Sequence, residues 1–81
     1  MKSTYVEIHS IHDMTQFVQL AVMVDGDVTC RKGKYTVDGK SVMGVVSIDI
    51  STGVVVEYPE TATEFDEFVS QFISESKAER A

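Results

Sequence analysis

The chain has 81 residues, of which 43% are hydrophobic and 25% charged, and its formal net charge is −6. This length allows one domain with a modest core, and the composition excludes a disordered chain and argues against a general nucleic-acid binder. The single cysteine, Cys30, excludes an internal disulfide and a thiol-based metal site. The amino-terminal residues show no apolar signal region and no run is long enough to cross a membrane, so we expect a cytoplasmic protein.

The amino-terminal part of the chain predicts a strand followed by a helix. Thr4, Val6 and Ile8 alternate with the residues between them, which is the period of a half-buried strand. Ser10 can cap a helix, with Asp13 three residues on in a capping-box-like arrangement. Apolar residues then recur at helical spacing and predict an amphipathic helix from residue 11 to about 23. They are Ile11, Met14, Phe17, Val18, Ala21 and Val22.

The next segment predicts a turn and a hairpin. The Asp25-Gly26-Asp27 cluster is typical of a turn. Two short alternating runs follow, over residues 28–31 and 35–37, with Lys32-Gly33 as the candidate for the tight turn between them. Cys30 alternates with Val28 on the first run, so we expect it to be a buried core thiol.

A basic cluster lies in the middle of this otherwise acidic chain. It consists of Arg31, Lys32, Lys34 and Lys40. Charged residues of this kind form a solvated surface in most proteins, and the alternative is a local patch for an anion or a partner.

The stretch from residue 40 to residue 50 admits two interpretations. Its β-branched residues favour a strand by propensity. Val42, Val45 and Val46 also satisfy the spacing of one helical face. Gly44 costs about 1 kcal/mol in a helix interior and also weakens a strand, so we expect it to allow a close approach to the backbone.

The carboxyl-terminal part predicts a strand and the clearest helix of the chain. Ser51-Thr52-Gly53 is typical of a turn, and residues 54–58 alternate as a strand that Pro59 ends because it lacks a donor. Thr61 and Glu64 have the spacing of a capping box. An apolar stripe at i, i+3, i+4, i+7 and i+8 then predicts a helix. Its members are Phe65, Phe68, Val69, Phe72 and Ile73.

Two segments carry a resemblance to a known family. Lys40-Ser41-Val42-Met43-Gly44 resembles the K-S-[IL]-M-G serine-phosphorylation segment of HPr, the histidine-containing phosphocarrier protein of the bacterial sugar phosphotransferase system. Phe17-Val18-Gln19-Leu20-Ala21 resembles the first helix of the same family. The resemblance implies a short helix from about Ser41 to Ser47, and we therefore expect a helix rather than a strand there.

The predicted elements follow one another as strand, helix, strand, strand, short helix, strand and helix, and helices must cover one face of the sheet to bury its apolar side. We expect an open-faced α/β (α+β) sandwich like that of HPr, with a four-stranded antiparallel sheet covered on one face by three helices in the order βαββαβα. It forms one domain over residues 1–81, ordered from about residue 3 to residue 74. A polar tail over residues 75–81 is expected to fray.

The resemblance breaks at the family's G-[IL]-H-A-R-P-A phosphocarrier signature. Counting back without a gap from Phe17 places Ser10 where the active histidine belongs and His12 where the arginine belongs. Matching Ile11-His12 directly requires a deletion of two residues. Neither alignment supplies the arginine clamp or the proline, and Asp13 adds a negative charge beside any phosphoryl group.

The resemblance also implies candidate site residues. The family's serine matching Ser41 is phosphorylated by a dedicated kinase, whereas the residue type and position also suit an N-cap, and both roles are compatible. Val42 and Met43 are either core residues or a small exposed docking patch. We predict partner contacts at Val42, Met43, Gly44 and Val46.

Three functional hypotheses follow. The first is a non-catalytic, HPr-like regulatory or protein-interaction module, with Ser41 as a phosphorylation site and with an HPr serine kinase, phosphotransferase-system proteins or transcription regulators as partners. The second is a divergent phosphocarrier that accepts a phosphoryl group on His12 or, less plausibly, on His9, which otherwise suits a loop. The third is a structural homologue with neither activity. We expect no enzyme site, cofactor or metal, and no direct contact with nucleic acid or membrane.

Overall fold

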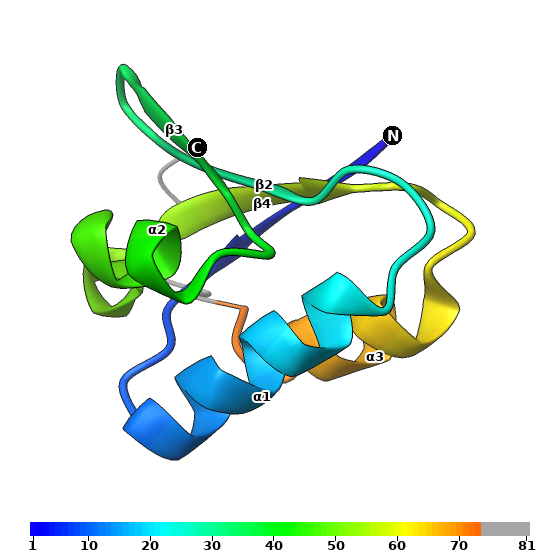
Figure 1. Ribbon diagram of the computed structural model, residues 1–81, viewed down its shortest axis with the longest axis horizontal. Helices are drawn as coiled ribbons and strands as arrows, with labels where there is room; N and C mark the ends of the chain where they lie inside the picture. Colours follow the sequence, from blue (N-terminus) through cyan, green and yellow to red (C-terminus); the bar gives the residue numbers. More distant parts are fainter. Residues whose placement is uncertain (74–81) are drawn as a thin grey trace.

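In this computed structural model, which describes residues 1–73, a four-stranded antiparallel sheet lies against three helices on one face (Figure 1). The strands are β1 (Lys2–Val6), β2 (Thr29–Lys32), β3 (Tyr35–Asp38) and β4 (Val54–Tyr58), in the spatial order β1-β4-β2-β3. The helices are α1 (Ile11–Val22), α2 (Val42–Ser47) and α3 (Thr63–Ser70), and a 3-10 turn, η1 (Ile50–Thr52), precedes β4. The expected open-faced sandwich and its element order are confirmed. The predicted tail over residues 75–81 lies outside the described residues.

The inner face of the sheet consists of apolar cross-strand rows. Val56 of β4 pairs with Thr4 of β1 on one side and with Cys30 of β2 on the other. Val6 pairs with Val54 in the next inner row, and all these residues except Thr4 are buried. Burial, together with the charge of nearby Asp38, raises the pKa of the Cys30 thiol to about 12, so the thiol stays protonated at neutral pH. The prediction of a core thiol is confirmed.

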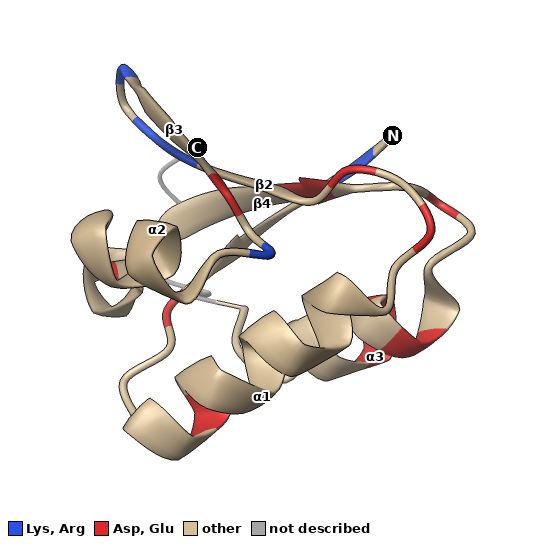
Figure 2. Ribbon diagram, in the orientation of Figure 1, with Lys and Arg blue, Asp and Glu red and all other residues tan. Residues whose placement is uncertain are grey.

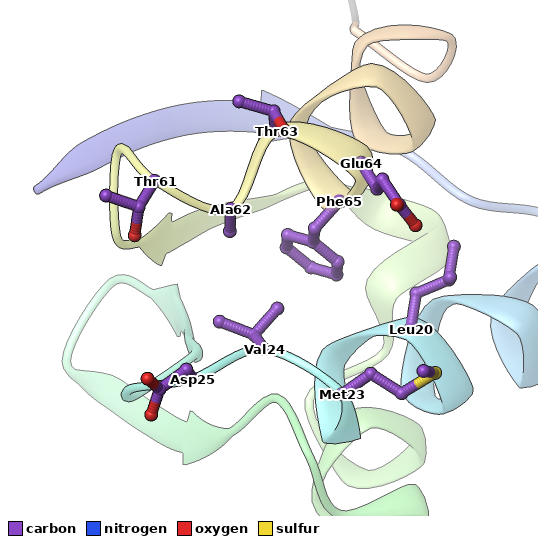
Figure 3. A pocket seen from close by; sticks show the side chains of 9 residues that line it. All are labelled: Leu20, Met23, Val24, Asp25, Thr61, Ala62, Thr63, Glu64 and Phe65. Carbon is purple, nitrogen blue, oxygen red and sulfur yellow. The ribbon is translucent and has the colours of Figure 1, made fainter.

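Aromatic side chains join α1, α3 and β4 beneath the sheet. The ring of Phe65 on α3 lies 5.3 Å from Phe17 of α1 and 5.1 Å from Tyr58 of β4, centroid to centroid, and all three residues are buried. Figure 3 shows the Phe65 ring directed from α3 toward Val24 and Leu20, across a groove of about 310 Å³ between the end of α1 and the start of α3. These contacts hold the two long helices side by side.

A network of polar side chains around the Tyr58 hydroxyl connects α3 to the sheet. The Tyr58 hydroxyl donates to Asp66 Oδ1 at 2.6 Å and lies 2.7 Å from Thr4 Oγ1, while Lys2 Nζ pairs with Asp66 at 2.9 Å. The hydrogen bonds from Tyr58 and Lys2 hold the pKa of Asp66 below its ordinary value. Burial and the bond to Asp66 raise the pKa of Tyr58 to about 12. At neutral pH the phenol is therefore a donor and the carboxylate its charged acceptor.

Helix α1 begins where the capping residues predicted, but its buried face is narrower than the predicted stripe. Ser10 Oγ accepts a hydrogen bond from the backbone N–H of Asp13 at 3.4 Å, which confirms the N-cap. Phe17, Val18 and Ala21 are buried and Met14 packs against them. Ile11 and Val22 are exposed, so their assignment to the core face is wrong. Figure 1 shows the reason for Ile11, because the first turn of α1 extends past α3.

The β2–β3 turn lies one residue later than predicted. Lys32 still belongs to β2 and pairs with Tyr35, so the two connecting residues are Gly33 and Lys34. Gly33 takes a φ of 59°, a left-handed conformation that glycine adopts without the steric cost of a Cβ atom. The glycine therefore occupies the first turn position, which displaces Lys32 into the strand.

Both ends of α3 also differ from the prediction. The helix begins at Thr63, and Ala62 occupies the N-cap without a side-chain bond, so the Thr61–Glu64 capping box is wrong. The turn after Pro59, in which the Ala62 N–H donates to the Pro59 carbonyl, delays the helix start. At the other end, Ile73 has left the helix and forms a β-bridge with Val6. β1 is an outer strand of the sheet, and the Glu7 N–H directly after it donates to the Phe72 carbonyl at 3.0 Å, so this end of the chain pairs with the strand instead of continuing the helix.

Candidate functional site

Ser41 marks the start of α2 and caps it. Its backbone is extended, with a φ of −107° and a ψ of 120°, and its Oγ accepts a hydrogen bond from the Gly44 backbone N–H at 3.2 Å. Its own N–H donates to the Asp38 carbonyl at the end of β3. The N-cap interpretation of Ser41 is confirmed, and the half-buried hydroxyl is held against the first turn of the helix.

We expect Ser41→Ala to lower the free energy of unfolding by about 1 kcal/mol, because the Gly44 N–H would lose its acceptor. Urea denaturation monitored by circular dichroism would measure the change. Ser41→Asn provides the matched control, since asparagine caps helices about as well as serine does. Equal stability of the alanine and asparagine variants would contradict the capping role.

Gly44 lets α2 pack closely against the end of β3. A Cβ atom at this position would lie 3.3 Å from the Asp38 carbonyl oxygen and 3.3 Å from Val37 Cβ. The expected close approach at Gly44 therefore exists, and the approaching group is this chain's own strand.

Helix α2 buries one residue of its apolar set and presents the others to solvent. Val45 is fully buried, whereas Val42 and Val46 are 57% exposed and Met43 is 80% exposed. Val42, Val45 and Val46 share the spacing of one helical face, yet only Val45 is buried. Of the two interpretations of Val42 and Met43, the exposed one holds. We call the exposed set Val42, Met43 and Val46 the α2 face.

Ile11 is an exposed apolar residue that the sequence analysis assigned to the core. It is 80% exposed in the first turn of α1. Helices α1 and α2 are in contact, and Figure 1 shows the first turn of α1 toward the same end of the molecule as α2. The available signal was its position directly after the N-cap, at the very start of the helix.

The start of α1 presents an exposed imidazole without a neighbouring cation. His12 is exposed in the first turn, between the capping residue Ser10 and the acidic Asp13. The nearest arginine in sequence, Arg31, lies on β2 and pairs with Glu57 across the sheet at 3.6 Å. Within residues 1–73, no lysine or arginine lies near the beginning of α1, as the distribution of blue segments in Figure 2 shows. Within the described residues, therefore, no neighbouring cation can hold a phosphoryl group on His12.

The remaining candidates lie outside this arrangement. His9 is exposed in the β1–α1 connection, and its Nε2 lies 3.5 Å from Glu7 Oε1. Lys40, next to Ser41, donates its Nζ to the Val24 carbonyl at 3.0 Å and so ties the start of α2 to the end of α1. In the part of the chain that the structure describes, no group of His, Cys, Asp and Glu side chains could hold a metal ion, and no helix is long and apolar enough to cross a membrane.

Comparison with known proteins points to one family. A family model described as "PTS HPr component phosphorylation site" matches residues 11–59, from the first residue of α1 to Pro59. Among solved structures, the chain is similar to the crystal structure of a phosphocarrier protein HPr from Bacillus anthracis str. Ames, with 26% sequence identity and a TM-score of 0.63. That alignment covers 90% of this chain and 94% of the other. No curated protein matches the chain.

Proposed function

The chain belongs to the HPr phosphocarrier family of the phosphotransferase system, and we propose that it serves there as a non-catalytic regulatory and protein-interaction module. The observation that carries the proposal is the contrast between its two candidate sites. The α2 face and the capped Ser41 match the family's serine segment, whereas the start of α1 has neither the arginine nor the proline of the phosphocarrier signature. Proteins of this family interact with other proteins of the phosphotransferase system.

We propose that partners bind the α2 face. Val42, Met43 and Val46 expose apolar surface on one short helix, and Gly44 keeps that helix tight against the end of β3. An unbranched methionine side chain adapts to differently shaped partners. The partner class that fits is a protein of the bacterial cytoplasm: an HPr serine kinase, another phosphotransferase-system component or a transcription regulator.

Phosphorylation of Ser41 is the regulatory step that we propose. A phosphate on this N-cap adds a charge of about −2 and three acceptor oxygens beside the Gly44 backbone N–H, which already donates to Ser41 Oγ. The modification would therefore keep the helix start and change the charge beside the α2 face. A partner that reads Val42 and Met43 would meet that charge directly, because Ser41 precedes them in the chain.

The alternative function is a divergent phosphocarrier that uses His12. The observation that favours it is the exposed position of His12 in the first turn of α1. Two features of the sequence argue against it. Neither alignment places an arginine beside the imidazole, and the negative charge of Asp13 would repel that of a phosphoryl group. We therefore rank it second.

Intact-mass measurement with site mapping tests both functions in parallel reactions. One contains phosphoenolpyruvate and the general phosphotransferase enzyme, and the other contains ATP and the HPr serine kinase. We expect acid-stable phosphate on Ser41 and no label on histidine. Ser41→Ala should abolish the label, and His12→Ala and His9→Ala should leave it unchanged.

Acid-labile phosphate that is lost in His12→Ala but kept in His9→Ala would overturn the regulatory assignment and establish a phosphocarrier. No label in either reaction would leave a protein with the family fold and neither chemistry. Binding measurements on the α2 face would then decide whether the interaction role stands alone.

A further inference from the structure

A second surface feature lies at the other end of α2 from Ser41. A groove of about 490 Å³ separates the tip of the β2–β3 hairpin from the end of the helix. The hairpin contributes Lys32, Lys34 and Tyr35 to it, and the opposite wall contains Ile48 and Asp49. None of these residues belongs to the α2 face, so the groove is independent of the function proposed above.

The groove offers an apolar contact at the hairpin. The Tyr35 side chain is 74% exposed although it lies in β3, and Val37 lines the same groove with a half-buried side chain. An aromatic ring of this kind supplies a large contact area at a low entropic cost and is a frequent anchor of protein interfaces. The groove can therefore hold an apolar side chain of a partner against Tyr35.

Lys32 and Lys34 bring two positive charges to the groove of this otherwise acidic molecule, against one carboxylate, that of Asp49. The net charge of the chain is −6, yet four of its seven basic residues lie between residues 31 and 40 (Figure 2). Lys32 and Lys34 line the groove, and none of the ion pairs within residues 1–73 involves either of them. Lys32 Nζ instead donates to the Thr52 hydroxyl. An acidic partner would be repelled by most of the surface and attracted to this end.

Within the described residues, the hairpin also forms one edge of the sheet. β3 is the outermost strand beside β2. Lys32 and Tyr35 flank a two-residue turn and therefore form a hydrogen-bonded pair. Thr36 follows Tyr35 and lies opposite Arg31, so its backbone N–H and C=O point away from β2. Such an edge can accept one more extended segment through main-chain hydrogen bonds.

We infer that the β3 edge and this groove together bind an acidic, extended segment of a partner protein. One apolar side chain of that segment would lie against Tyr35, and its carboxylates would pair with Lys32 and Lys34. A nucleic acid fits less well, because two lysines on a molecule with a net charge of −6 neutralise few phosphates. A second copy of this chain, offering its acidic α3 residues, is an outcome that the experiment distinguishes.

The test is a two-dimensional ¹H–¹⁵N NMR titration of the full chain with an acetylated decapeptide of alternating glutamate and threonine with one central phenylalanine. We expect saturable shifts over residues 32–37 and 47–49, and weaker binding as the salt concentration rises. A peptide with lysine in place of glutamate should not bind. Replacement of the phenylalanine by alanine should weaken binding about tenfold.

Matched variants locate the interaction. Tyr35→Ala and Lys34→Gln should each weaken peptide binding at least about fivefold. Lys2→Gln removes the same charge on β1, and Met43→Ala removes a side chain of the α2 face, so both should bind as the wild type does.

Shifts that map to the α2 face, an equal loss in Lys2→Gln and Lys34→Gln, or no shift at millimolar peptide would each overturn the inference. Concentration-dependent shifts of the groove and of α3 without peptide would also overturn it and would assign the groove to self-association. A phosphorylation failure at Ser41 would leave the groove assignment unaffected.

Discussion

Phe65→Ala is expected to lower the free energy of unfolding by about 3 to 5 kcal/mol, the largest effect of any single substitution considered for this protein. A domain is stable by only about 5 to 15 kcal/mol in total, so a large fraction of the variant molecules would be unfolded at physiological temperature. Thermal and urea denaturation, monitored by circular dichroism, would measure the loss.

The size of this effect follows from the position of the ring. Phe65 packs against Phe17 of α1 and edge-on against Tyr58 of β4, and so it links the elements on either side of α3. Its removal would also enlarge the neighbouring groove between the end of α1 and the start of α3. The cost of the cavity left by the ring adds to the lost transfer free energy.

Phe68→Ala is the matched control. Phe68 lies on the same helix and contacts Phe72 at 5.1 Å, but it is only half-buried. We expect this substitution to cost clearly less than Phe65→Ala. Equal losses for the two variants would show that helix content, and not the ring cluster, limits stability.

Met43→Ala is expected to reduce kcat/KM for phosphorylation of Ser41 by the HPr serine kinase about 30-fold, which corresponds to about 2 kcal/mol of lost partner contact. Met43 is 80% exposed on α2 and adds nothing to the core, so the thermal midpoint should stay unchanged. The prediction rests on the proposed function, because it assumes that the kinase reads the α2 face next to its target serine.

Met23 supplies a control with the same side chain and the same exposure. It is 81% exposed directly after α1 and does not belong to the α2 face, and Met23→Ala should leave kcat/KM within about twofold of the wild type. If Met43→Ala and Met23→Ala behaved alike, the α2 face would not be the kinase-binding surface. Comparing two exposed methionines removes general effects of surface hydrophobicity from the result.

The strands and the start of α1 followed from local rules. The alternation of Val54, Val56 and Tyr58 placed β4 correctly, and Ser10 placed the start of α1, because both signals act within a few residues. Element ends were less predictable. Thr61 and Glu64 have capping-box spacing, yet the turn after Pro59 delays the helix, and Ile73 continues the apolar stripe but pairs with β1 instead.

The candidate site, like the helices and strands, was predictable from the sequence only in part. The resemblance to HPr located Ser41 and the short helix, where propensity alone favoured a strand. Which of its apolar residues face solvent did not follow from spacing, since Val42, Val45 and Val46 all fit one helical stripe and only Val45 is buried. Exposure depended on how far α2 reaches beyond the sheet, which is a property of the packed molecule.

The sequence by itself therefore determined the element order, the inward-facing residues of the strands, the capping serines Ser10 and Ser41, and the absence of the phosphocarrier signature. These features depend on side-chain chemistry and on short, fixed periods along the chain. Only the tertiary structure decided that the α2 face and Tyr35 are exposed and that Lys32 and Lys34 line a groove. Those outcomes arise because segments distant in sequence pack against the limited inner surface of one small sheet, and the residues left outside it face solvent.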